Sequence, residues 1–191
     1  MPESLFFYIF AQNIKYKKII GKEENMIVGR KEEIAELDKL YYSDRPEFVA
    51  IYGRRRVGKT FLIKQALKDR ITFQHTGVSP VDQDNDRNRL KIQLESFYYA
   101  LLNQGLEGYK MPKSWMEAFF LLEQLLQDQD NGERQVIFID ELPWMDTPRS
   151  GFLPAFENFW NGCSCAQFKQ KQRKVKMGEM NCKWLRMSNI S

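Results

Sequence analysis

The chain has 191 residues, 43% of them hydrophobic, which is enough for one globular domain of ordinary size with a buried core. No apolar run approaches the roughly 18 residues of a membrane span, and Leu5–Phe10 lacks the basic lead and cleavage site of a secretory signal, so we expect a cytoplasmic protein without membrane contact. The net charge of +4 comes from residues 162–191, which hold five Lys and two Arg against one Glu, so the composition of the remaining chain excludes a strongly basic, nucleic-acid-binding core.

The first half of the chain alternates predicted helices and strands. Apolar residues at helical spacing predict a helix over Arg30–Tyr42, and the apolar run Phe48–Tyr52 is typical of a buried strand. A second helix is predicted over Phe61–Leu67, and a second strand begins at Ile71. The polar stretch Thr76–Arg89 contains glycine, proline and several aspartates, so it predicts a loop.

Two longer helices follow. Apolar spacing predicts them over Leu90–Gln104 and Ser114–Gln127. Ser114 is the expected N-cap of the second, and Glu117, three residues on, completes a capping box. The aromatic side chains of this helix are expected in the core; they are Trp115, Phe119 and Phe120.

A phosphate-binding loop stands between the first predicted strand and the helix after it. Residues 53–60 read Gly-Arg-Arg-Arg-Val-Gly-Lys-Thr, a complete G-x-x-x-x-G-K-[ST] or Walker A motif. Gly53 and Gly58 permit turns that bring the backbone close to phosphates, and successive N–H groups form an anion nest at the start of the helix. We expect Lys59 to reach the β- and γ-phosphates and Thr60 to place its hydroxyl on Mg²⁺. The loop's other residues are Arg54, Arg55, Arg56 and Val57, and the three arginines either add positive potential or point to solvent.

A second motif follows a turn at residues 130–132. The apolar run at residues 136–139 predicts a central parallel strand buried on both faces. Asp140 then lies at the carboxyl end of the strand, where ligands bind in open α/β sheets. We expect Asp140 to hold Mg²⁺, directly or through water, as a Walker B aspartate, and Glu141 to act as the general base for an attacking water. The alternative is a strand that ends in two solvated acids.

Three segments in order resemble the archaeal-type ATPase family, a part of the AAA+/STAND group of P-loop NTPases. They are the h-h-G-R-x-x-E box within Met26–Glu33, the loop Tyr52–Thr60 and the strand segment Phe138–Trp144. The resemblance implies an α/β fold with an AAA+-like core, a parallel sheet flanked by helices, over residues 26–161. It also implies Mg²⁺-dependent ATP hydrolysis, with Lys59 and Glu141 as catalytic residues.

The same resemblance places Gly29 and Arg30 near the adenine and ribose. Arg30 could equally be an exposed residue at the start of a helix. Both interpretations remain open from the sequence.

The resemblance does not cover the two ends of the chain. Because Met26 opens the matching region, residues 1–25 are expected to be an N-terminal extension that the native protein could lack. A short helix is predicted over Pro154–Trp160, but no apolar run of strand length follows. We therefore expect a core truncated at its C-terminal end, without the family's sensor residue, helical lid or arginine finger. An uncovered strand edge would favour self-association.

Residues 162–191 form a basic tail with three interpretations: out-of-frame sequence, a disordered segment that contacts nucleic acid, or a segment folded onto the core. Its cysteines, Cys163, Cys165 and Cys182, do not define a disulfide framework. With His75 as the single histidine, they do not favour a zinc site. His75 itself is expected at a strand edge or in a loop rather than in catalysis.

The sequence therefore predicts binding of ATP and Mg²⁺, with hydrolysis that is slow or absent because the sensor and arginine-finger elements are not found. Two other classes stay open. One is a non-catalytic nucleotide-binding or interaction module, and the other is a nucleic-acid-binding protein that acts through the basic tail.

Overall fold

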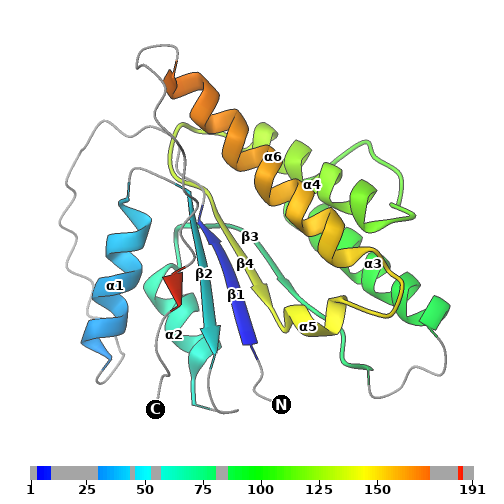
Figure 1. The fold of residues 1–191 in the computed structure, drawn as a ribbon, viewed down its shortest axis with the longest axis horizontal. Coiled ribbons are helices and arrows are strands. Elements are labelled where there is room, and N and C mark those ends of the chain that lie inside the picture. The colour runs from blue at the N-terminus through cyan, green and yellow to red at the C-terminus, as the bar shows by residue number, and fades with distance from the viewer. Residues whose placement is uncertain are drawn as a thin grey trace.

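The computed structural model describes residues 4–9, 30–43, 46–52, 57–80, 86–172 and 185–186, which form an α/β domain (Figure 1). Within these residues the strands are β1 Ser4–Ile9, β2 Glu47–Tyr52, β3 Ile71–Thr76, β4 Val136–Asp140 and β5 Leu185–Arg186. The helices are α1 Lys31–Tyr41, α2 Lys59–Ala66, α3 Asp86–Asn103, α4 Trp115–Asp128, α5 Leu142–Met145 and α6 Phe152–Gln172.

The strands form one sheet with the order β3-β4-β1-β2-β5. Helices α1 and α2 lie on one side of this sheet, and α3, α4 and α6 lie on the other (Figure 1). The pairs β3–β4 and β2–β5 are parallel. Strand β1 is antiparallel to both β2 and β4, so β2 and β4 run in the same direction as each other and as β3. The carboxyl ends of β2, β3 and β4 therefore lie at one edge of the sheet, as expected for an open α/β fold.

Strand β1 departs from the predicted all-parallel sheet. It runs antiparallel between β2 and β4, with Phe7 opposite both Val49 and Phe138. The parallel prediction came from crossover helices, which constrain strands that follow a helix, whereas β1 precedes the first helix. The structure thus places part of the predicted N-terminal extension in the centre of the sheet.

Strand β4 divides the core into two clusters because alternate side chains of a strand point to opposite faces. Ile137 and Ile139 pack with α3, α4, α5 and α6, whereas Val136 and Phe138 pack with α1 and α2. Every residue of β4 is buried. This confirms the prediction of a central strand buried on both faces.

The predicted helices are present, with shifted bounds. Helix α3 begins at Asp86, inside the predicted loop. The prediction missed this start because the first turn of the helix is polar and carries no apolar periodicity. Ser114 caps α4 as predicted, its Oγ accepting a hydrogen bond from Glu117 N–H at 3.2 Å. The Glu117 carboxylate accepts from the Lys113 N–H at 2.8 Å, one residue before the N-cap. Phe120 is 51% exposed, so its predicted place in the core was wrong.

Helix α6 continues well beyond the predicted helix over residues 154–160. It reaches Gln172, so the expected boundary between core and tail at residues 161–162 falls inside a helix. The sequence has no proline between residue 155 and the end of the helix, so nothing there forbids helical backbone. Residues 173–184 and 187–191 of the tail lie outside the described residues. None of the described helices is both long and apolar enough to cross a bilayer.

Candidate functional site

Helix α2 begins at the end of the predicted phosphate-binding loop. Gly58 is its N-cap and has a φ of 82°, a left-handed conformation that favours glycine. The Leu62 N–H donates to the Gly58 carbonyl at 2.9 Å, which closes the first turn of the helix. Lys59, the first helical residue, is 6% exposed. Gly58, Lys59 and Thr60, the last three residues of the predicted loop, therefore lie at the N-terminus of a helix, where orphan N–H groups favour anions.

Thr60 and Asp140 meet across the sheet edge, although they are 80 residues apart in the chain. The Thr60 hydroxyl donates a hydrogen bond to Asp140 Oδ2 at 2.9 Å. Asp140 ends β4 and is 8% exposed. Two oxygen ligands of the type that Mg²⁺ prefers are thus adjacent, one from each predicted motif.

The chain turns sharply directly after Asp140. Glu141 has a φ of 54° and a ψ of 39°, the left-handed region that non-glycine residues rarely adopt. Its carbonyl accepts a hydrogen bond from the Trp144 N–H at 2.9 Å. The Gly77 N–H, just past β3, donates to the Asp140 carbonyl at 2.9 Å. A Cβ at Gly77 would lie 2.6 Å from the Glu141 carbonyl oxygen, so only glycine lets the two strand ends approach this closely.

Gln93 is a site residue that the sequence analysis missed. Its side chain is 1% exposed and reaches from α3 to the segments that follow β3 and β4. The sequence does contain a signal that could have identified Gln93. It is a polar residue on the apolar face of the helix, which it shares with Leu90, Leu94 and Phe97. Apolar periodicity alone treats such a residue as a gap in the pattern.

Arg30 lies beside the predicted phosphate-binding loop. It is the N-cap of α1, in a left-handed conformation with a φ of 56°. Its Nη2 donates to the Val57 carbonyl at 2.7 Å. Its Nη1 is buried and has no hydrogen-bond partner among the described residues. The side chain therefore faces the loop rather than solvent at this helix start.

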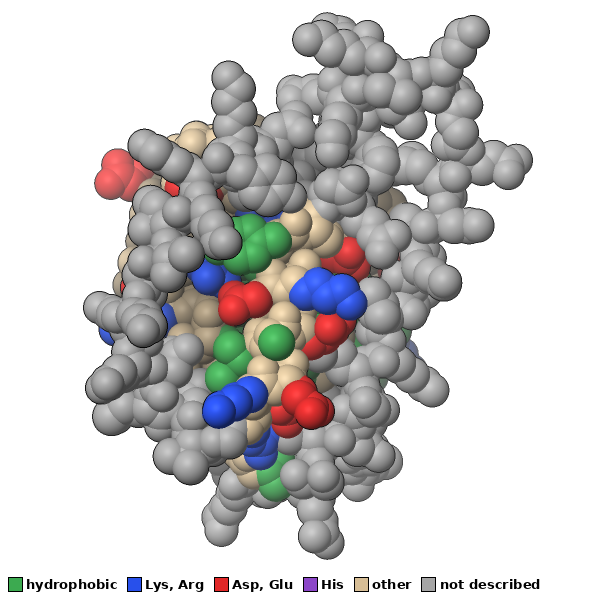
Figure 2. All heavy atoms as spheres, turned by 90° about the vertical axis from the view of Figure 1, so that its left-hand side faces the viewer, with side chains coloured by type: hydrophobic (Ala, Val, Ile, Leu, Met, Phe, Trp, Pro, Cys, Tyr) green, Lys and Arg blue, Asp and Glu red, His purple; other side chains and the backbone are tan. Residues whose placement is uncertain are grey.

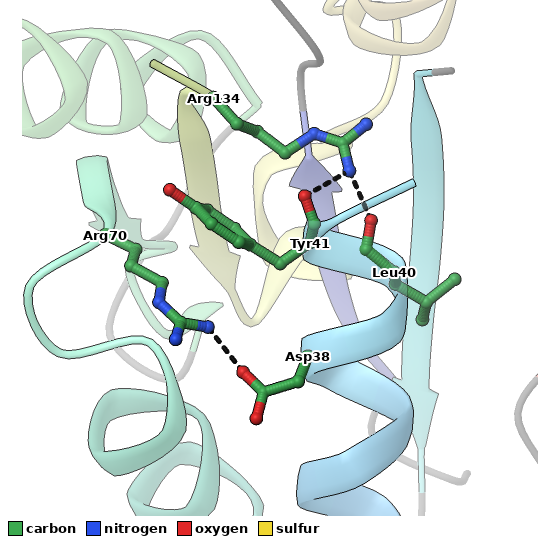
Figure 3. Close-up of polar contacts among 5 residues, drawn as sticks. All are labelled: Asp38, Leu40, Tyr41, Arg70 and Arg134. Carbon is green, nitrogen blue, oxygen red and sulfur yellow. Dashed lines mark hydrogen bonds and ion pairs between the residues drawn. The ribbon is translucent and has the colours of Figure 1, made fainter. Parts of the chain in front are cut away.

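The far end of α1 is anchored by two arginines from other elements (Figure 3). Arg134, two residues before the start of β4, donates to the carbonyls of Leu40 and Tyr41, the latter at 2.6 Å. Arg70, between α2 and β3, pairs with Asp38 at 2.5 Å and lies 4.5 Å from the centre of the Tyr41 ring. These contacts hold α1, the helix that Arg30 caps, against the segment after α2 and the segment before β4.

The remaining predicted loop residues and Gly29 cannot be placed in the same way. Gly29, Gly53, Arg54, Arg55 and Arg56 lie outside the described residues. The described part of the chain brings Thr60 and Asp140 together and sets Arg30 against Val57.

Charge on the α1 side of the molecule is mixed (Figure 2). Among the described residues on this face, acidic and basic side chains are interspersed, and neither sign gathers into a continuous patch. Helix α1 itself has Glu32 and Glu33 in its first turn and Lys39 in its last, which complements the helix dipole.

His75 lies in edge strand β3 and is 6% exposed. Burial lowers its pKa to about 4, so the imidazole is neutral at physiological pH. The ring packs edge-on against Phe97 at 5.1 Å. Its place in the strand agrees with the prediction of a strand-edge residue, and its surroundings are those of a core side chain.

The family model for an ATPase domain predominantly from Archaea matches residues 27–155. The chain belongs to this family. The match runs from the h-h-G-R-x-x-E box to the start of α6, and it includes both residues of the Thr60–Asp140 contact.

Two relatives of the ATPase domain come from the archaeon Methanocaldococcus jannaschii. An uncharacterized protein is 30% identical over 132 residues, which are 69% of this chain and 25% of the relative. An uncharacterized ATP-binding protein is 44% identical over 45 residues, 24% of this chain and 76% of that protein. The chain thus spans only a quarter of the first relative's length. No solved structure matches the chain at a significant level.

Proposed function

We propose that this ATPase-family domain binds ATP together with Mg²⁺ at the carboxyl edge of its sheet. The observation that carries the proposal is the 2.9 Å hydrogen bond from the Thr60 hydroxyl to Asp140 Oδ2. It joins the last residue of the loop motif to the acid at the end of β4, and those two side chains would hold the metal, directly or through water. The name of one relative, an ATP-binding protein, supports the same ligand.

Each motif residue has a role in this proposal. The loop of Gly53, Arg54, Arg55, Arg56, Val57 and Gly58 cradles the phosphates with its backbone N–H groups, and Gly29 and Arg30 lie toward the nucleoside. Lys59 contacts the β- and γ-phosphates. Bound Mg²⁺ would supply charge neutralisation at the phosphate oxygens. Glu141 accepts the proton of the attacking water when hydrolysis occurs.

We propose that this chain is part of an AAA+-like P-loop core that binds ATP but hydrolyses it slowly or not at all. Hydrolysis needs a positioned water and charge stabilisation at the γ-phosphate, and an arginine finger supplies several orders of magnitude of rate. No motif of the sequence identifies that finger or the sensor, and we expect turnover to be slow or absent.

Titration of ATP, with Mg²⁺ and with a chelator, tests the metal-side assignment. Thr60→Val and Asp140→Asn should each weaken binding in Mg²⁺ by about tenfold or more, the effect of losing one charge-assisted contact. In chelator, Thr60→Val and the parent should bind alike. Thr72→Val is the matched control, because the Thr72 hydroxyl contacts Val136 N–H, at the opposite end of β4.

Glu141→Gln separates binding from catalysis in the same preparation. The variant should bind Mg²⁺ and ATP like the parent and lose any residual turnover. Parent-level hydrolysis by Glu141→Gln would show that Glu141 is not the base.

A further inference from the structure

The Gln93 side chain links the segment after β3 to helix α5 at the carboxyl edge of the sheet. Its Oε1 accepts a hydrogen bond from the Val78 N–H at 3.0 Å, and its Nε2 donates to the Val78 carbonyl at 2.7 Å. The same Nε2 donates to the Trp144 carbonyl at 3.0 Å. Val78 follows β3 and Trp144 follows β4, so one buried amide spans both segments.

The contact with Trp144 closes a chain of hydrogen bonds that leads to Glu141. The Trp144 N–H donates to the Glu141 carbonyl, so Gln93 holds the far side of the turn in which Glu141 has a left-handed backbone. Gly77, next to Val78, holds the near side through the Asp140 carbonyl. A buried amide with both polar atoms satisfied is costly to disturb.

We propose that Gln93 is a positioning residue for Glu141. By fixing Trp144 against Val78, it holds the turn that aims the Glu141 carboxylate at the site where water would attack. This inference rests on the proposed function, because it assigns a purpose to the turn that carries the base. A base held by such a shell keeps the fixed geometry that proton transfer requires.

The chain contains a matched control for this role. Gln104, just after α3, makes the same kind of two-point backbone contact, but inside β3: its Oε1 accepts from Gln74 N–H at 2.8 Å and its Nε2 donates to the Gln74 carbonyl at 2.9 Å. The Gln104 Nε2 also donates to the Ala100 carbonyl, near the end of α3. Among the described residues, Gln104 therefore reproduces the two-point backbone contact of Gln93 without a hydrogen bond to the Glu141 turn.

Hydrogen exchange on the nucleotide-free full chain tests the proposal directly. Gln93→Met keeps the length of the side chain and removes all three hydrogen bonds, while Gln104→Met removes the equivalent contacts at Gln74. We expect amides of residues 141–147 to exchange about tenfold faster in Gln93→Met, the effect of one lost hydrogen bond. They should stay at the parent rate in Gln104→Met, and α4 should be unchanged in both.

A second variant covers the case in which Gln93→Met fails to fold. Gln93→Glu keeps an acceptor for the Val78 N–H but, when ionised, cannot donate to the Trp144 carbonyl, so exchange at residues 141–147 should again rise. Parent-level exchange there in whichever Gln93 variant folds, or an equal rise in Gln104→Met, overturns the proposal.

Turnover and affinity then distinguish this proposal from the proposed function. If the parent hydrolyses ATP, Gln93→Met should lower kcat with little change in KM, because the base moves while the phosphate loop does not. If the parent binds ATP and Gln93→Met keeps the parental exchange rates and kcat, the positioning role of Gln93 is wrong but the proposed function stands. A parent that does not bind ATP would remove the proposed function, and exchange would still report whether Gln93 holds the turn.

Discussion

Replacing Arg134 with methionine is expected to lower the free energy of unfolding by about 2–4 kcal/mol. Arg134 is 3% exposed, and its guanidinium donates to the last carbonyls of α1, at Leu40 and Tyr41. Methionine fills similar space but donates no hydrogen bond, so the Tyr41 carbonyl loses its donor, while the Leu40 carbonyl keeps the backbone N–H of Ser43 at 3.3 Å. The unpaired Tyr41 carbonyl costs roughly 1–3 kcal/mol, and the lost hydrogen bond to Leu40 adds roughly 1 kcal/mol, which together give the stated range.

Arg70→Met provides the comparison within the same cluster. The side chain of Arg70 is 29% exposed and that of its partner Asp38 is 45% exposed. An exposed ion pair contributes about 0–1 kcal/mol, and stacking on Tyr41 adds roughly 0.5–1 kcal/mol. We therefore expect Arg70→Met to cost about 1 kcal/mol, clearly less than Arg134→Met.

Urea unfolding followed by circular dichroism under reducing conditions measures both variants. The midpoint should fall with an unchanged slope, since the surface exposed on unfolding stays the same. A loss below about 1 kcal/mol for Arg134→Met, or equal losses for the two variants, would refute the reasoning that buried C-terminal carbonyls dominate this anchor.

Three further predictions concern the sheet and its edge. Burial lowers the pKa of His75 to about 4 from the ordinary 6.5, so the stability that this histidine contributes above pH 6.5 is lost as the pH falls toward 4, by up to roughly 3 kcal/mol. Urea unfolding across this pH range should show that loss for the parent and not for His75→Gln. The same pH dependence in both proteins would contradict the prediction. Phe7→Pro removes a backbone donor from β1, which pairs on both sides, and should destabilise the chain by roughly 2 kcal/mol or more relative to Phe7→Val; equal thermal midpoints would mean that β1 contributes nothing to the sheet. Gly77→Ala places a Cβ 2.6 Å from the Glu141 carbonyl and should cost roughly 1–3 kcal/mol in the same unfolding assay; parental stability would show that the turn yields freely.

The sequence predicted those parts of the fold that local patterns encode. The four apolar residues before Asp140 specify a strand buried on both faces, and the loop motif specifies the start of a helix, so the two halves of the site could be expected at one sheet edge. The hydrogen bond between Thr60 and Asp140 agrees with that expectation. These features need only short-range periodicity and one topological rule.

The rest depends on contacts between residues far apart in the chain. Gln93 and Arg134 are polar residues whose partners lie 51 and up to 94 positions away, and no local pattern predicts such pairs. Strand β1 has a strand-like apolar run, but nothing in it specifies an antiparallel place between β2 and β4. The extension of α6 to Gln172 was missed because its apolar pattern fades before the helix ends.

Equilibrium binding of a fluorescent ATP analogue, with Mg²⁺, tests the central claim most directly. The titration compares the parent chain with Lys59→Ala and with Lys64→Ala, which removes an exposed lysine from the same helix. The account predicts saturable binding by the parent and Lys64→Ala, and its loss in Lys59→Ala. Absence of binding by the folded parent, or equal binding by Lys59→Ala, would contradict a phosphate site at the start of α2.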